Sequence, residues 1–211
     1  MKIKKVAALV QKAKRVVIME KPIPGGVRQY LSNGYAAYPI HGLPRLGKEN
    51  LLTIFDVDPA DWDKWHVSVR EIPAALNFGD TDDGEYRTEL AVPVFFQNGE
   101  TIMPFCTEDN GVVFLNEKYL GPVSDGVTEF YLREDRRGKL FFAIKSGLYL
   151  RAVIMPQAVV CGSFADRMRE FLFRCNKELV SPSGTTIQMD RDKMPQGKTV
   201  EDEDNERPAS E

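Results

Sequence analysis

Four aspartates lie close together in the first half of the chain, and carboxylates of this kind could bind a catalytic metal ion. They are Asp56, Asp58, Asp61 and Asp63. Paired carboxylates can hold Mg²⁺ for phosphoryl transfer, but no neighbouring segment supplies a nucleophile, a base or an ordered glycine loop. We therefore interpret these aspartates as helix-capping and surface residues. A metal-dependent enzyme is the weakest of our three hypotheses.

A second acidic segment, Asp80-Thr81-Asp82-Asp83-Gly84-Glu85, is superficially like the start of a calcium-binding loop. An EF-hand loop needs the order Asp-x-Asp-x-Asp-Gly and a bidentate glutamate at its twelfth position. The order here is short by one residue, and the twelfth position counted from Asp80 is Ala91, which has no ligand atom. The segment is therefore predicted to be a solvated turn.

Residues for acid–base or nucleophilic catalysis are scarce. The two histidines are His41 and His66, and the chain has no H-E-x-x-H or G-x-S-x-G pattern. Pro24-Gly25-Gly26 is not followed by Gly-Lys-Ser/Thr, so it is not a phosphate-binding loop. A catalytic pair of a cysteine and a histidine is still an alternative, because such partners can be far apart in the sequence and adjacent in the fold. We expect no enzymatic activity, no metal and no cofactor.

Cysteine usage and hydropathy indicate a cytoplasmic protein. The cysteines are Cys106, Cys161 and Cys175. An odd number without C-x-x-C spacing favours reduced thiols over disulfides or a zinc site. The apolar run at 6–10 is too short for a signal-peptide core, and no stretch approaches the roughly 20 apolar residues of a membrane span. We expect no association with a membrane.

Charge is distributed unevenly along the 211 residues. Residues 197–211 hold six acidic and two basic side chains, a charge of −4, which leaves +1 for residues 1–196 of the net −3. The first fifteen residues carry six lysines and arginines and no acidic residue. A basic start and an acidic end are typical of a binding surface and a solubilising tail.

The basic start also has the spacing of an amphipathic helix. Its apolar residues recur at intervals of three and four: Ile3, Val6, Ala7, Val10 and Ala13. Its basic residues fall roughly opposite that stripe: Lys4, Lys5, Lys12 and Arg15. We therefore predict a helix with one buried face and one cationic flank.

The rest of the chain alternates short strands, turns and short helices. Asn33-Gly34 between two apolar runs is the strongest hairpin signal, with strands at 27–31 and 35–40. Further expected elements are helices at 48–55, 60–65 and 117–123 and strands at 67–72, 89–96, 100–106, 112–115, 128–133, 140–146 and 149–154. The inventory predicts an α+β fold with a mostly antiparallel sheet and two main helices on one face.

Beyond residue 160 the pattern changes. Phe164, Met168 and Phe171 begin a helical spacing that continues to Leu179. It predicts a C-terminal amphipathic helix over 161–180. The segment 181–211 is too polar to offset its ordering entropy, and we predict a disordered acidic tail.

Seven residues carry a resemblance to a known family. They are Phe114, Asn116, Lys118, Tyr119, Leu120, Met155 and Pro156. With Leu115 inserted after the phenylalanine, this segment resembles the closing half of the last domain of the bacterial DNA polymerase III beta sliding clamp. The resemblance implies a clamp-like domain over 1–160, elaborated by an insertion near 41–87.

The resemblance also implies two sites. Helices of clamps present lysines and arginines to the DNA backbone, which implicates Lys4, Lys5, Lys12, Arg15 and Lys118. The alternative is an ordinary solvated lysine-rich face. The terminal Met-Pro segment of the bacterial clamp helps to form a pocket for client peptides. The matching Met155 and Pro156 are therefore either a partner-binding site or a buried strand end.

Our first hypothesis is a non-catalytic, clamp-like accessory protein, encoded by a phage or another mobile element, that associates with double-stranded DNA or replication proteins. One domain does not encircle DNA, so this hypothesis requires a homo-oligomer. The alternative is a protein-binding adaptor or inhibitor with a clamp-like fold and no DNA binding, in which the acidic tail occupies a basic partner surface.

Overall fold

An eight-stranded sheet dominates the part of the chain that the computed structural model describes. The described residues are 2–91, 95–97, 99–109, 111–124 and 126–158, with Glu170 and Arg174. The chain divides into two compact units, Met1–Val159 and Val160–Glu211, and both sheets belong to the first unit. Apart from Glu170 and Arg174, the predicted C-terminal helix and acidic tail lie outside the described residues.

The large sheet has the strand order β4-β1-β2-β3-β11-β10-β9-β5. The strands are β1 (Arg15–Ile23), β2 (Gly26–Ser32), β3 (Ala36–Pro39), β4 (His66–Glu71), β5 (Tyr86–Arg87), β9 (Glu129–Glu134), β10 (Leu140–Ser146) and β11 (Tyr149–Ile154). All neighbours are antiparallel except β1 and β4, which are parallel. A second antiparallel sheet contains β6 (Phe95–Gln97), β7 (Glu100–Cys106) and β8 (Val112–Asn116). The predicted α+β class with a mostly antiparallel sheet is confirmed.

The described helices are short. They are α1 (Ile3–Gln11), α2 (Lys48–Ile54) and the 3₁₀ helices η1 (Pro59–Lys64) and η2 (Glu117–Val123). Val6 and Val10 of α1 are buried, as its spacing predicts. The prediction that this helix includes Ala13 is wrong, because the chain turns at Lys14, where φ is 49°, and Ala13 is exposed.

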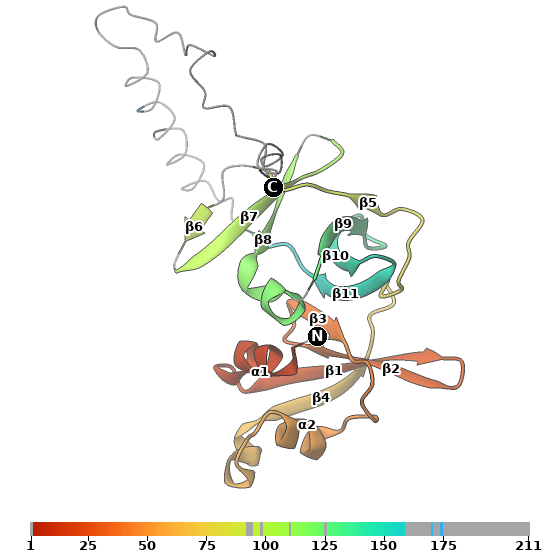
Figure 1. The fold of residues 1–211 in the computed structure, drawn as a ribbon, viewed down its shortest axis with the longest axis vertical. Coiled ribbons are helices and arrows are strands. Elements are labelled where there is room, and N and C mark those ends of the chain that lie inside the picture. The colour runs from red at the N-terminus through yellow and green to blue at the C-terminus, as the bar shows by residue number, and fades with distance from the viewer. Residues whose placement is uncertain are drawn as a thin grey trace, which may run out of the picture. The chain divides into compact units, whose positions relative to one another are not determined.

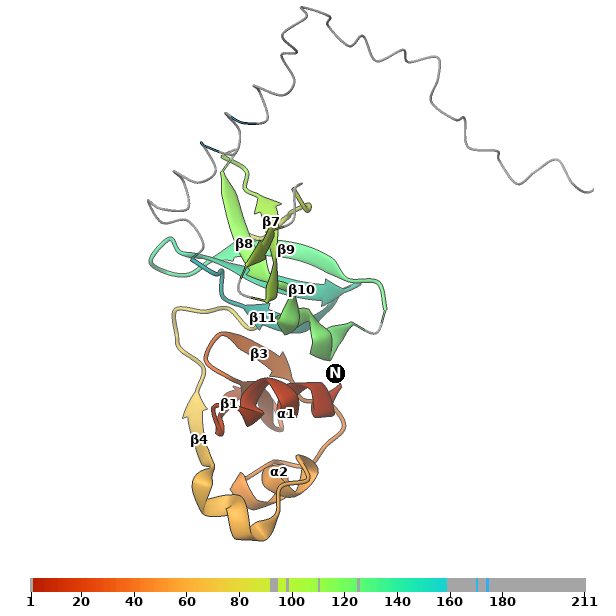
Figure 2. The ribbon, with the colours of Figure 1, turned by 90° about the vertical axis from the view of Figure 1, so that its left-hand side faces the viewer.

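The same order of elements occurs twice, although the sequence shows no repeat. One helix and three antiparallel strands form α1-β1-β2-β3, and the same order recurs in η2-β9-β10-β11. The two sets meet where β3 pairs with β11, and α1 and η2 lie on the same side of the sheet, to its left in Figure 1 and toward the viewer in Figure 2. α2, η1 and the strands β4 to β8 come between the two sets in the chain.

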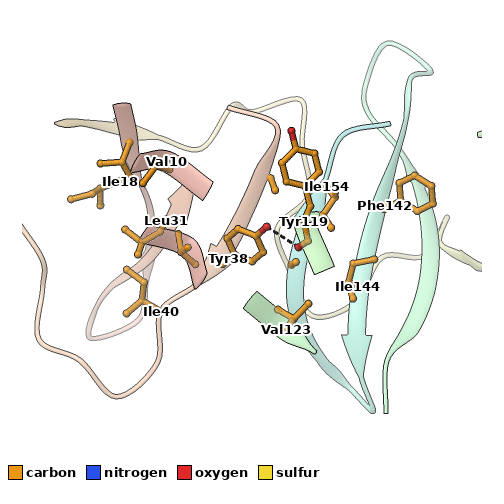
Figure 3. Packing of buried hydrophobic residues seen from close by; sticks show 14 of the residues in the cluster. Val10, Ile18, Leu31, Tyr38, Ile40, Tyr119, Val123, Phe142, Ile144 and Ile154 are labelled. Carbon is orange, nitrogen blue, oxygen red and sulfur yellow. Dashed lines mark hydrogen bonds between the residues drawn. The ribbon is translucent and has the colours of Figure 1, made fainter. Parts of the chain in front are cut away.

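The junction of the two sets, which we call the seam, is narrow. Only Val153↔Ala37 and Ile154↔Ala36 pair in register between β11 and β3, and the amide of Met155 donates to the Tyr35 carbonyl at 2.8 Å. The buried Tyr38 hydroxyl of β3 donates to the Tyr119 carbonyl of η2 at 2.8 Å, as the dashed line in Figure 3 shows. A single hydroxyl thus connects the sheet of one set to the helix of the other.

Alternation along the central strands builds a core on each face of the sheet. Phe142 and Ile144 of β10 point into the larger core beneath α1, α2 and η2. Phe141 and Ala143 point into the smaller core on the opposite face, which also contains Phe78. Because successive residues of a strand face opposite sides, β10 has to be apolar at nearly every position.

The segment 72–85, which we call the strap, covers the smaller core. Arg133 of β9 is fully buried, and its guanidinium donates to Glu85 at 2.8 and 2.6 Å and to the Asn77 and Gly79 carbonyls at 3.0 and 2.9 Å. Lys145 of β10, also buried, forms an ion pair with the same Glu85 carboxylate. The predicted solvated turn is therefore right for its exposed tip, Asp83-Gly84, and wrong for Glu85.

Tyr38→Phe tests the seam. The substitution removes the hydrogen bond to the Tyr119 carbonyl, and we expect it to lower the free energy of unfolding in urea by about 1–2 kcal/mol. The control is Tyr149→Phe at a residue that is 70% exposed, for which we expect a change within about 0.5 kcal/mol. Equal effects of the two substitutions would show that the Tyr38 hydroxyl has no special role.

The effect of Tyr38→Phe on the free energy of unfolding should depend on pH. Burial raises the pKa of Tyr38, so the folded state keeps the neutral phenol at a pH where the unfolded chain loses the proton, above about 10. The stability that this protonation contributes is complete below that pH and is lost as the pH rises. The stability difference between wild type and Tyr38→Phe should therefore shrink above about pH 10 in urea titrations. A constant difference would contradict the assigned burial.

Glu85→Gln tests the strap. It leaves the buried cations Arg133 and Lys145 without their shared negative charge, and we expect a loss of about 3–5 kcal/mol in the free energy of unfolding. Asp83→Asn, in the exposed tip of the same segment, is the matched control and should have little effect. A loss below about 1 kcal/mol for Glu85→Gln would argue against the buried ion cluster.

Candidate nucleic-acid interface

The outer flank of α1 is basic and contains no acidic residue. Lys4 and Lys5 are both exposed, and they border different grooves. Lys4 lies at a groove of about 410 Å³ between α1 and the α2–η1 segment. Lys5 lies at a larger groove of about 780 Å³ that α1 shares with η2, β7 and β9. The two lysines therefore present charge on both sides of the exposed helix face.

The remaining predicted basic residues follow the helix. Lys12 is the exposed C-cap residue of α1, where a cation interacts favourably with the helix dipole. Arg15 is exposed but lies in β1, opposite His66 of β4. The prediction that Arg15 belongs to the cationic flank of the helix is wrong, because α1 ends at Gln11 and the chain turns before Arg15.

One backbone contact and one side-chain contact of Lys2, the residue before α1, hold this helix beside η2. The amide of Lys2 donates to the Pro122 carbonyl at 2.7 Å, and the Lys2 ammonium lies 3.4 Å from the Ser124 hydroxyl. The aliphatic stem of Lys5 lies against Gly121, where an added Cβ would meet its Cδ at 3.6 Å. This spacing is an ordinary van der Waals contact, so the Lys5 stem packs on the surface of η2.

Lys118, at the start of η2, is the predicted basic residue whose charge is already paired. Its Nζ lies 2.5 Å from Oε1 of Glu100 in β7 and 5.1 Å from the centroid of the Tyr119 ring. The hydrogen bond from Lys118 lowers the pKa of Glu100. Burial alone would lower the pKa of Lys118, but its hydrogen bond to Glu100 raises it above the ordinary value.

Asn116 organises this corner of the larger groove. Its side chain is 1% exposed, and its Oδ1 accepts from the Lys118 amide at 3.1 Å, which caps η2. Its Nδ2 donates to Oε2 of Glu100 and, at 2.9 Å, to Oε1 of Gln157. One buried amide therefore connects the helix, the second sheet and the segment after β11.

Met155 and Pro156, the predicted partner-binding pair, follow β11 at the seam. Met155 is half-buried against the smaller core, and Pro156 is also half-buried. The amide of Gln157 then donates to the Phe114 carbonyl of β8 at 2.8 Å. The exposed Tyr35 ring stacks on Tyr119 nearby, with ring centroids 6.4 Å apart. The pair is therefore joined to β8 through Gln157, and the Met155 side chain packs on the face of the sheet opposite Tyr119.

The aspartates of the α2–η1 segment have local roles. Asp58 accepts from the Ala60 amide at 2.9 Å and caps η1, which confirms the predicted capping role. Asp61 pairs with Lys64 at 2.5 Å. Within the described residues, no three histidine, cysteine or acidic side chains gather as metal ligands would. Asp56, Asp58 and Asp61 line the smaller groove opposite Lys4.

Sequence reasoning identified the lysines of this surface but missed Glu100. Glu100 is separated from Lys118 by 18 positions, and the pairing of β7 with β8 is what brings it to the start of η2. The sequence predicts a strand at 100–106. The register that places Glu100 beside Asn116 and Lys118 depends on how β7 pairs with β8, and neither strand's own sequence determines it.

Comparison of the chain with protein-family models, with curated proteins and with solved structures finds no match. Among the described residues, no helix has both the length and the apolar character that crossing a bilayer requires. The case for a function therefore depends on the geometry of the α1–η2 face.

Asn116→Ala tests how this corner is held. The substitution removes the cap of η2 and two further hydrogen bonds, so we expect a loss of about 2–3 kcal/mol in the free energy of unfolding by urea denaturation. Val127→Ala, at a residue that is 80% exposed, is the control and should cost less than about 0.5 kcal/mol. An Asn116→Ala variant as stable as this control would refute the organising role of the amide.

Proposed function

We propose that this chain is a non-catalytic, clamp-like protein that associates with double-stranded DNA through the face formed by α1 and η2. The observation that carries the proposal is the side-by-side placement of these helices on one face of a continuous sheet, with Lys4, Lys5 and Lys12 exposed. The duplicated order of a helix and three strands supports the clamp-like interpretation, because the resemblance at 112–156 implies the same inventory.

The proposed binding is electrostatic and independent of DNA sequence. Lysine ammonium groups on α1 neutralise phosphates and release condensed counterions, which supplies affinity without contacts to base edges. The flank of α1 suits this role because its cations are spread along the helix and no carboxylate lies among them.

A ring requires several copies, because one unit presents a single pair of helices. We propose a homo-oligomer in which each copy contributes one α1–η2 face to the inside. Met155 and Pro156, with the exposed Tyr35 beside them, would then recruit client proteins of the replication machinery. Origin in a phage or another mobile element remains part of this proposal.

The second candidate is a protein-binding adaptor or inhibitor without DNA binding. It is favoured by the ion pair of Lys118 with Glu100 and by the three aspartates opposite Lys4, which reduce the positive charge on both sides of α1. Deletion of residues 197–211 should alter partner capture if this candidate is right, and unaltered capture would exclude the tail from that role.

Lysine substitution on α1 decides between the two candidates. We expect Lys4→Ala/Lys5→Ala/Lys12→Ala to weaken binding to a DNA duplex by about tenfold or more at low salt. The slope of log K against log salt is negative, and its magnitude should decrease by up to about 2.7, which is about 0.9 per lost phosphate contact. Fluorescence anisotropy at several salt concentrations measures both quantities.

The matched control removes the same three charges elsewhere. Lys48→Ala/Arg137→Ala/Lys139→Ala changes exposed residues on α2 and in the β9–β10 turn and should leave the salt slope unchanged. Sedimentation of the wild type should show an oligomer. A monomer without salt-sensitive binding would remove the DNA function and leave the adaptor, and equal losses in the two triple variants would exclude α1 as the contact surface.

A further inference from the structure

The Glu100 carboxylate occupies an arrangement of donors that suits an external oxyanion. One of its oxygens accepts from the Lys118 ammonium at 2.5 Å, and the other accepts from the Asn116 side-chain amide. A phosphate presents oxygens of the same kind to a cation and a neutral donor. The larger groove therefore has an anion site whose present occupant belongs to the chain itself.

Both donors have contacts that do not depend on the acceptor. Asn116 is almost fully buried, and its other contacts, to the Lys118 amide and to Gln157, do not involve Glu100. The Lys118 ammonium also lies over the Tyr119 ring, a cation–π contact that is independent of the carboxylate. The side chains of Lys118 and Glu100 are 40% and 36% exposed, so rotation about its own side-chain bonds can take the Glu100 carboxylate into solvent while the buried Asn116 amide stays in place.

We propose that Glu100 is an internal competitor for a DNA phosphate at the site formed by Lys118 and Asn116. This inference rests on the proposed DNA-binding function and deepens it, because it names the residue that limits affinity at the η2 end of the interface. DNA that reaches this face displaces the carboxylate, and Lys118 exchanges one anionic partner for another. Lys5, on the opposite side of the same groove, is available without such an exchange.

The exchange has a measurable consequence for affinity. An exposed ion pair of this kind is a weak interaction, so removing the competitor should strengthen DNA binding by about two- to fivefold. Because Lys118 neutralises one phosphate in the wild-type complex and in the variant complex, the slope of log K against log salt should stay the same.

The experiment compares Glu100→Gln with Glu117→Gln. Both residues border the same groove and both substitutions remove one negative charge, but the Lys118 hydrogen bond is made to Glu100. We expect the gain in affinity, with an unchanged salt slope, for Glu100→Gln alone, and we expect Lys118→Met to abolish the gain when it is added to Glu100→Gln. Thermal melts of each variant establish that it is folded.

A direct readout separates phosphate contact from a general change in surface charge. In ¹⁵N-labelled Glu100→Gln, the Asn116 side-chain amide resonances should shift when a short duplex is added. If wild type binds DNA but Glu100→Gln gains no more than Glu117→Gln, the inference is overturned while the proposed function stands. If no variant binds DNA with a salt dependence, the proposed function itself is overturned.

Discussion

The seam between β3 and β11 is the constraint on which the rest of the described fold depends. Two register pairs and one backbone hydrogen bond join the strands there, yet this contact makes one continuous sheet from two sets of three strands. The Tyr38 hydroxyl extends the junction to η2. Without the pairing of β3 with β11, α1 and η2 would belong to two separate layers and would not form a common face.

Both faces of this sheet pack apolar side chains, and one of them also contains a buried ion cluster. Apolar side chains fill the larger core under the helices, whereas the strap over the smaller core is fixed by Glu85 between two buried cations. Because a buried charge without a partner is costly, displacement of the strap from Arg133 and Lys145 would be unfavourable. The helix face, in contrast, has exposed lysines.

The local sequence pattern predicts the individual helices and strands, but it does not predict which strands pair over long distances. The spacing of Val6 and Val10 predicts α1, and Asn33-Gly34 predicts the turn between β2 and β3, because both depend on neighbours in the sequence. The parallel addition of β4 to β1 depends on strands about fifty residues apart and leaves no local signal. The duplicated order of elements was invisible because it repeats a topology and not a sequence.

The candidate site shows the same division. Lys4, Lys5 and Lys12 could be chosen from the sequence because a helical period places them on a flank, but the end of α1 before Arg15 depends on the turn at Lys14. Which cations are free is a question of tertiary contacts. Glu100 neutralises Lys118 only because strand register brings them together.

The central claim is that α1 and η2 together form the surface that contacts DNA. Hydrogen–deuterium exchange of the full chain with and without a short duplex tests it most directly. The account predicts slower exchange in α1 and at the start of η2, with no change in the strap or in α2. Protection of the strap or of α2 with α1 unaffected, or no protection anywhere, would contradict it.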